Sequence, residues 1–268
     1  MIARCLIGVL LSTWFHHGFS AEKPEEDIAH IREELGVNAF TAPSIAVIFA
    51  ELRALQPLPL DKVWRDLPET TPQDRARLGL CAGQTIAAGF LAVTAQKPSR
   101  IDAVGRVLLR LARGLGIGEH VSRHAKSIFE LAARNQWNEM EAELVRSQVD
   151  VERALLALKD EELAHLVSLG GWLRGLEAVA TTVLEDYQPG NGRRLIQPQL
   201  LAYYTDRVST LNPALRDRPL FKSIRAVLDE LKEITAHAPA DGPAEADVKK
   251  IRDLTRDVNR AIVDPKDE

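Results

Sequence analysis

Two histidines spaced four residues apart are the first side chains in this chain that could do chemistry. His120 and His124 would lie on one face of a helix, where two imidazoles can share a metal ion. A zinc protease would need a glutamate directly after the first histidine, and the residues between these two are Val, Ser and Arg. Solvated surface histidines are the simpler interpretation, and a metal site is the alternative.

A Glu-x-x-His sequence at Glu162 and His165 is similar to the pairs that project inward in di-iron helical bundles. Such a bundle needs two of these motifs and two further glutamates, and Asp27–His30 is a poor substitute for the second motif. A site for one divalent transition metal could still form from His120, His124, Glu162 and His165. It would require the helices that carry them to pack side by side.

The third candidate is polar rather than metal-binding. Arg174 and Glu177 are three residues apart within a mostly apolar helix, with Trp172 nearby. A charge in such a helix is partly buried and needs a partner, so the pair predicts an ion pair that fixes helix register. The alternative is an anion-binding site, in which Arg174 holds a ligand and Gln84 from another glycine-bearing helix joins the network.

The familiar catalytic patterns are absent from the sequence. It contains no Gly-x-Ser-x-Gly elbow, no phosphate-binding glycine loop and no dinucleotide fingerprint after a strand. Cys81 lies in an apolar segment, which predicts a raised thiol pKa and a poor nucleophile. We therefore expect no catalytic residues and no obligatory cofactor, with a divalent metal as the alternative.

Two long apolar segments must form the centre of the fold. Leu78–Ala95 has no charged residue, and Leu163–Leu184 is similar to it. Each carries Gly-x-x-x-Gly, at Gly79/Gly83 and at Gly171/Gly175. Because an interior glycine costs a helix about 1 kcal/mol relative to alanine, these glycines predict close approach of two backbones. The first segment is long enough to span a membrane, but its Gly, Ala, Gln and Thr content favours the buried centre of a helical bundle.

Helical periodicity and caps extend over nearly the whole chain, and no alternating strand pattern is present. The sequence predicts an all-α multi-helix bundle with two long glycine-containing central helices, and an internal duplication relating them stays open. The expected helices are Glu25–Leu35, Thr41–Leu55, Asp61–Leu67, Thr71–Gln96, Arg100–Leu115, Glu119–Arg134, Asn138–Leu158, Asp160–Tyr187, Pro198–Leu211 and Pro219–His237.

The two ends of the chain carry their own patterns. Residues 1–20 have the basic start, short apolar run and small residues of a signal peptide, which predicts export to the periplasm or beyond. We expect a bundle over 21–237, a linker over 238–244, and a C-terminal amphipathic helix and tail over 245–268. Its apolar stripe either docks on the body or pairs with a second copy or another protein.

Charge excludes some partners. The formal net charge is −4, and such a mildly acidic chain gives no reason to expect nucleic-acid binding or adhesion to anionic lipid. Nor do we expect stable membrane insertion after removal of the signal.

Two stretches carry a resemblance. RHAKSI at Arg123–Ile128 and LVSLGGWLRGLEAV at Leu166–Val179 resemble segments of uncharacterised, exported, all-helical bacterial proteins. That family has no established activity, so the resemblance implies a helical fold and a bacterial setting but no site. The resulting hypothesis is a non-enzymatic exported protein that binds a protein partner or a small ligand between its central helices. The competing hypothesis is a metal-binding protein or metal-dependent enzyme.

Overall fold

The computed structural model describes residues 43–264, and over that range the regular secondary structure is helical, without strands. The predicted all-α bundle is thereby confirmed. The predicted signal peptide, the helix Glu25–Leu35 and the pair Asp27–His30 lie outside the described residues. The elements in chain order are α2 Ala46–Arg53, α3 Leu60–Val63, α4 Arg75–Thr94, α5 Pro98–Leu115, α6 Gly118–Ala133, α7 Trp137–Ala157, α8 Glu161–Glu185, α9 Pro189–Gly192, the 3-10 turn η1 Arg193–Leu195, α10 Pro198–Ser209, α11 Pro213–Arg216, α12 Pro219–His237 and α13 Glu245–Val263.

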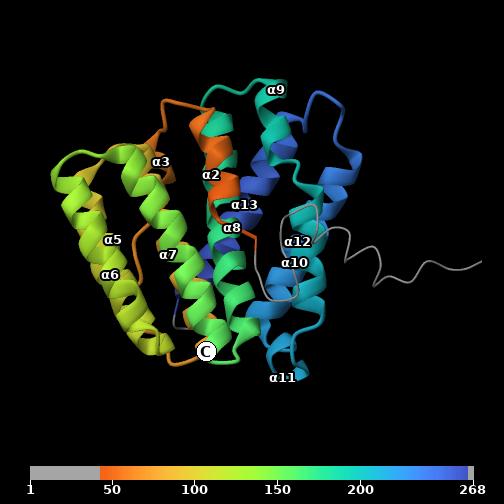
Figure 1. Cartoon of the computed structure of the whole chain (residues 1–268). Helices are drawn as coiled ribbons and strands as arrows, with labels where there is room; N and C mark the ends of the chain where they lie inside the picture. The colour runs from red at the N-terminus through yellow and green to blue at the C-terminus, as the bar shows by residue number, and fades with distance from the viewer. Residues whose placement is uncertain (1–42, 265–268) are drawn as a thin grey trace, which may run out of the picture.

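Helix α8 is the axis of the bundle (Figure 1). It packs most extensively against α4 and α13, and also contacts α2, α3 and α7. Helices α5 and α6 extend the bundle on one side, since α5 lies on α4 and α6 joins α5 to α7. On the other side, α10 packs on α12, and α12 packs on α13. The two central helices predicted from glycine content therefore touch more partners than any others.

Glycine decides how closely α4 and α8 approach. A Cβ atom on Gly83 would overlap the backbone carbonyl of Val167, and one on Gly170 would overlap the carbonyl of Leu80. The motif glycines of α8 serve a different neighbour, because Gly171 and Gly175 receive the isoleucine side chains at the start of α2. The predicted short-range crossing is confirmed, and α8 uses its three glycines to admit two different helices.

Helix α4 is, among the described residues, the one helix long and apolar enough to cross a membrane by length and composition. Every residue in its most apolar window is buried inside the protein. Its apolar surface is thus covered by α8, α5, α7 and α13. A buried core helix can be as long and apolar as a membrane span. The burial of α4 agrees with the bundle core that its glycine and alanine content predicted.

The C-terminal helix α13 is part of this core. Its apolar stripe is buried at Val248, Ile251, Val258 and Ile262, and Leu254 is partly buried. Arg77 of α4 holds the end of α13 by donating to the carbonyls of Ala261 and Asp264, where a cation also opposes the negative end of the helix dipole. Of the two arrangements expected for this stripe, the structure shows the docking on the body of the chain, against α8, α12 and α4.

Three long helices begin differently from the sequence prediction at their N-terminal ends. Helix α4 begins at Arg75, because Asp74 accepts the backbone N–H of Arg77, and not at Thr71. Helix α7 begins at Trp137, one residue before the predicted start at Asn138, and no side chain caps it. Asp160 occupies the N-cap position of α8, but its carboxylate accepts from Arg75 instead of capping the helix.

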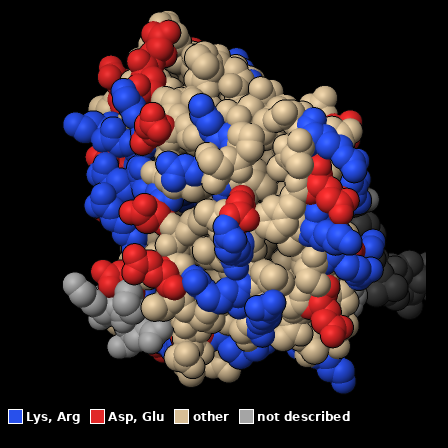
Figure 2. Space-filling model, turned by 90° about the vertical axis from the view of Figure 1, so that its left-hand side faces the viewer, with Lys and Arg blue, Asp and Glu red and all other residues tan. Residues whose placement is uncertain are grey.

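The outer surface of α5 and α6 is strongly charged. Figure 2 shows this side of the molecule, with Lys and Arg side chains spread over it and fewer Asp and Glu among them. The segment from Lys97 to Arg134 contains eight Lys or Arg residues and three Asp or Glu residues. Charge is therefore unevenly distributed, although the whole chain is mildly acidic.

The crossing of α4 and α8 gives a direct test. Gly83→Ala should lower the free energy of unfolding by about 2 kcal/mol or more, because the new methyl group forces two backbones apart. Gly190→Ala is the matched control, since no atom lies within 4 Å of its added Cβ, and it should change stability by less than about 1 kcal/mol. Urea unfolding followed by circular dichroism measures both. Equal effects of the two substitutions would contradict the close approach.

Removal of α13 gives a second test. Deleting residues 245–268 should abolish cooperative unfolding or leave an insoluble protein, because it uncovers the apolar face of α8 and strips partners from buried polar groups. A truncation that removes only residues 265–268 keeps α13 and serves as the control. Thermal unfolding of the two proteins distinguishes the outcomes, and a long truncation with a sharp, unshifted transition would show that α13 is dispensable.

Candidate functional site

A buried carboxylate is the centre of the polar network that joins α8 to its neighbours. Glu177 is fully buried, at 0% exposure. Its Oε1 accepts from Nε of Arg65 at 2.8 Å. Its Oε2 accepts from Nη1 of Arg174 at 3.4 Å and from Nδ2 of Asn259 at 2.9 Å. An unpaired carboxylate at this depth would be very costly, so these three donors are what permit its burial.

The network continues on both sides of Glu177. Gln84 of α4 donates to the side-chain oxygen of Asn259 at 2.9 Å. Arg174 also donates through Nη2 to the backbone carbonyl of Val63, next to the loop that carries Arg65. Burial lowers the pKa of Arg174, the charge of Glu177 opposes that shift, and the nearby Arg65 adds to it. One network thus connects the loop after α3 with α4, α8 and α13.

A cavity of about 590 Å³ opens beside this network. Ligand pockets for small molecules fall in the range of about 300–1,000 Å³. Its polar wall includes Arg65, Gln84, Arg174, Glu177 and Asn259. An apolar wall is supplied by Leu67, Pro68, Ala88 and Val263, and the rest of the lining is Asp66, Glu69, Thr70, Thr85, Arg256, Arg260 and Asp264.

Several nitrogen donors at the cavity remain available to a ligand. Arg174 uses two of the five N–H groups of a guanidinium in the bonds described above. Nε of Arg256 is buried without a hydrogen-bond partner, and Arg260 is exposed at the rim. The acidic lining residues Asp66 and Glu69 are exposed. The lining thus carries four arginines and four acidic residues, and Nε of Arg256 is a buried donor there without a hydrogen-bond partner.

The structure brings together three of the four ligand-binding candidates proposed from sequence. Gln84, Arg174 and Glu177 share the network and the cavity. Trp172 points elsewhere: its indole N–H donates to Oε1 of Gln197 at 2.9 Å, and its ring packs 5.0 Å from that of Tyr204. Arg174 follows Trp172 by two positions in the helix, which is a rotation of about 200° about the helix axis.

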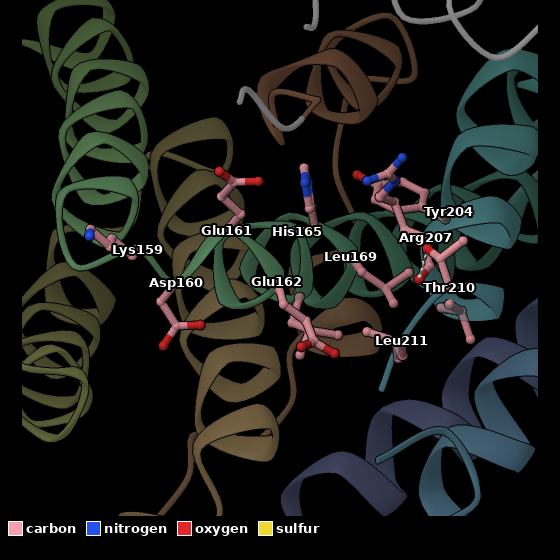
Figure 3. Close-up of a pocket in the computed structure, with 12 residues that line it drawn as sticks. Lys159, Asp160, Glu161, Glu162, His165, Leu169, Tyr204, Arg207, Thr210 and Leu211 are labelled. Carbon is pink, nitrogen blue, oxygen red and sulfur yellow. Dashed lines mark hydrogen bonds between the residues drawn. The ribbon is translucent and has the colours of Figure 1, made fainter. Parts of the chain in front are cut away.

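His165 lines a different cavity, of about 400 Å³, between α8 and α10 (Figure 3). Its Nδ1 lies 2.6 Å from the hydroxyl of Tyr203, and the two rings meet edge to face. Neighbouring Tyr204 shares a hydrogen bond with Ser168, and burial raises the pKa of the Tyr204 hydroxyl. His165 is thus one member of a packed aromatic and polar cluster.

The acidic residues around His165 diverge. Figure 3 shows Glu161 on the same side of α8 as His165, whereas Asp160 and Glu162 point to the other side. Asp160 is engaged by Arg75 at 2.8 Å. One oxygen of Glu162 is buried and lacks a hydrogen-bond partner. The Glu162–His165 pair therefore does not converge on one point in the described structure.

The two histidines of α6 lie apart from this pair. His120 is exposed. His124 sits between two carboxylates of α7, with Nδ1 at 2.8 Å from Glu143 and Nε2 at 3.0 Å from Asp150. The four-residue metal site is not assembled, because α6 packs on α5 and α7, whereas Glu162 and His165 line the cavity between α8 and α10. Over residues 43–264, no group of three or more His, Cys, Asp or Glu side chains could hold a metal ion.

Sequence inspection missed several residues of the network and the cavity. Arg65 lies in the irregular stretch after α3, and no local pattern marks it. The sequence does contain a signal for Asn259. This residue and Thr255 lie on the buried face of α13, beside Ile251, Val258 and Ile262. A polar residue on an otherwise apolar helix face indicates a buried hydrogen bond. The predicted burial of Cys81 is confirmed, and this burial raises the pKa of the thiol to about 12.

Comparison with known protein families, with characterised proteins and with solved structures finds no match for this chain. Any functional conclusion has to come from the network and the cavity themselves.

The contacts of His124 predict a pH dependence of stability. Burial alone would raise the pKa of Glu143, but hydrogen bonds and charges from His124 and Arg146 outweigh it and lower the pKa below its ordinary value of 4.5. A lowered pKa in the folded state adds stability above that value, and the added stability disappears as the pH falls through the folded-state pKa. Glu143→Gln should therefore cost about 1–2 kcal/mol at neutral pH and progressively less on acidification.

Urea unfolding of wild type and variant from neutral pH to about pH 3 measures this difference. Glu139→Gln removes the same charge from an exposed position on α7 and should leave the pH dependence unchanged. A constant difference between Glu143→Gln and wild type across that range would exclude the proposed coupling.

Proposed function

We propose that the protein is a non-enzymatic binding module that holds a small anionic ligand in the cavity between α4, α8 and α13. The observation that carries this proposal is the buried guanidinium of Arg174, which lines a ligand-sized cavity and makes two hydrogen bonds with its five N–H groups. Arg256 supplies a further buried donor, because its Nη2 pairs with Asp253 at 2.8 Å while its Nε has no hydrogen-bond partner. Carboxylates and phosphates suit arginine because two parallel N–H groups can bind two oxygens of one anion.

The apolar wall restricts the ligand class further. Leu67, Pro68, Ala88 and Val263 line the same cavity as the arginines. Burial of apolar surface contributes about 25 cal/mol per Å², so a ligand with a short hydrocarbon part would gain from this wall. The favoured class is a small amphiphilic carboxylate or phosphate monoester, with the anion toward Arg174 and Arg256.

Glu177 has a positioning role in this proposal. Its carboxylate fixes Arg65 and Arg174, so their guanidinium groups are held in place before any ligand arrives. Such preorganisation lowers the entropic cost of binding. Because Asn259 and Gln84 belong to the same network, occupancy of the cavity and docking of α13 are coupled through shared hydrogen bonds.

The metal-dependent alternative rests on His120, His124, Glu162 and His165, and no contact among these residues supports it. Its test is metal analysis of the purified protein. Stoichiometric zinc, iron or copper that is lost on replacing His120 and His124 would favour that alternative over the anion-binding proposal.

Thermal unfolding with a panel of ligands tests the proposed site. Short-chain carboxylates and phosphate monoesters should raise the Tm in a saturable way, and the corresponding uncharged alcohols should not. The double variant Arg256→Gln with Arg260→Gln should weaken binding by about tenfold or more, since each charge-assisted hydrogen bond contributes about 1.5–3 kcal/mol.

Lys249→Gln with Lys250→Gln is the matched control. It removes two charges from exposed positions of the same helix, outside the cavity. Retained binding in this control and lost binding in the arginine variant would support the site. Equal effects of both variants, or no shift with any anion of the panel, would contradict the proposal.

A further inference from the structure

The outer hairpin formed by α5 and α6 has a surface that the ligand cavity does not use. Its two helices pack on each other, and each is also held from behind, α5 by α4 and α6 by α7. Buried residues of α5 are spaced at helical intervals: Ile101, Val104, Leu108, Leu111 and Leu115. The opposite faces of both helices are solvent-exposed.

Basic side chains are spread over that side of the molecule, with acidic side chains among them (Figure 2). Helix α5 exposes Arg100, Arg106 and Arg113, and α6 exposes Arg123 and Lys126. The segment from Lys97 to Arg134 carries a formal charge of +5, from eight basic and three acidic residues. The chain as a whole has a charge of −4, so the remainder of the protein is strongly acidic. The net charge of the whole chain therefore does not reveal the uneven distribution of charge between this segment and the rest.

Few of these cations are neutralised locally. Arg106 pairs with Asp102 on its own helix. Arg100 lies over the ring of Trp64 at 4.6 Å, a contact that leaves its charge in place. Within the described residues, Arg123, Lys126 and Arg134 take part in none of the ion pairs of the structure. The field of the hairpin is thus directed outward, where it can attract an anionic partner.

An aromatic side chain lies on the same hairpin. Phe129 of α6 is 36% exposed, and its ring crosses α5 at Gly105, where a Cβ atom would approach the ring within 2.6 Å. Clustered basic residues are attracted to an anionic bilayer, and an exposed aromatic side chain can add a contact at its headgroup level. A nucleic acid would more often be met by a helix that enters a groove or by a positively charged channel.

We infer that the α5–α6 face docks on an anionic lipid surface. Arg123, Lys126 and Arg134 would lie at the headgroups together with the arginines of α5, and Phe129 would reach the headgroup level. Binding is peripheral and electrostatic, so it does not require any helix to leave the core. The signal peptide predicted from residues 1–20 is consistent with a membrane-bounded compartment, but the inference depends on the hairpin surface alone.

Vesicle co-sedimentation of the purified full chain lacking only residues 1–20 tests this inference. The protein should sediment with vesicles of phosphatidylcholine and phosphatidylglycerol, should remain in solution with phosphatidylcholine alone, and should dissociate in high salt. The triple variant Arg123→Gln, Lys126→Gln and Arg134→Gln should bind the anionic vesicles at least about tenfold more weakly. Each basic residue near such a surface contributes favourably to the free energy of binding.

The control is Lys222→Gln, Arg225→Gln and Lys232→Gln, which removes the same charge from α12 on another side of the bundle. Circular dichroism verifies that both variants remain helical, as expected for glutamine on helix surfaces. Retained vesicle binding in this control supports the hairpin surface. Equal weakening in both variants, equal binding to neutral vesicles, or tighter binding to duplex DNA than to anionic vesicles would overturn the inference.

Discussion

The contact between the backbones of α4 and α8 is the constraint on which the rest of the structure depends. Gly83 and Gly170 lie where any side chain would strike a carbonyl of the facing helix. Close approach gives many weak dispersion contacts, which together compensate for the unfavourable helix propensity of glycine. With these two helices fixed, α8 offers one remaining surface to α2 through Gly171 and Gly175, and another to α13.

The buried polar network follows from this arrangement. Glu177 lies at a depth where only neighbouring protein groups can satisfy it, and its donors come from the loop after α3, from α8 itself and from α13. Such a network specifies register more than it adds stability, because burial of each charge opposes the attraction between them. The same groups border the cavity, so the feature that positions α13 also shapes the proposed ligand site.

The sequence predicted the fold better than the site, and particular residues show why. The glycine spacing and uncharged length of Leu78–Ala95 predicted a close-packed central helix, since glycine is rarely tolerated in a helix without such a reason. Arg174 and Glu177 were recognised because charges in an apolar helix need partners nearby. Arg65 and Arg256 could not be found in this way, because surface arginines are common and only the fold places these two at a cavity.

Local information by itself determined that this protein is helical, where its long helices lie, and that α8 carries a buried ion pair. Periodicity, glycine spacing and charge within one segment are properties of neighbouring residues, so they need no knowledge of the partner. Only the tertiary structure decided that His124 pairs with Glu143 and Asp150, apart from Glu162 and His165. It also decided that Asn259 donates to Glu177 and that α5 and α6 pack together as one hairpin with exposed basic residues on both helices. These outcomes depend on which helices become neighbours, and that choice is made by the packing of the whole core.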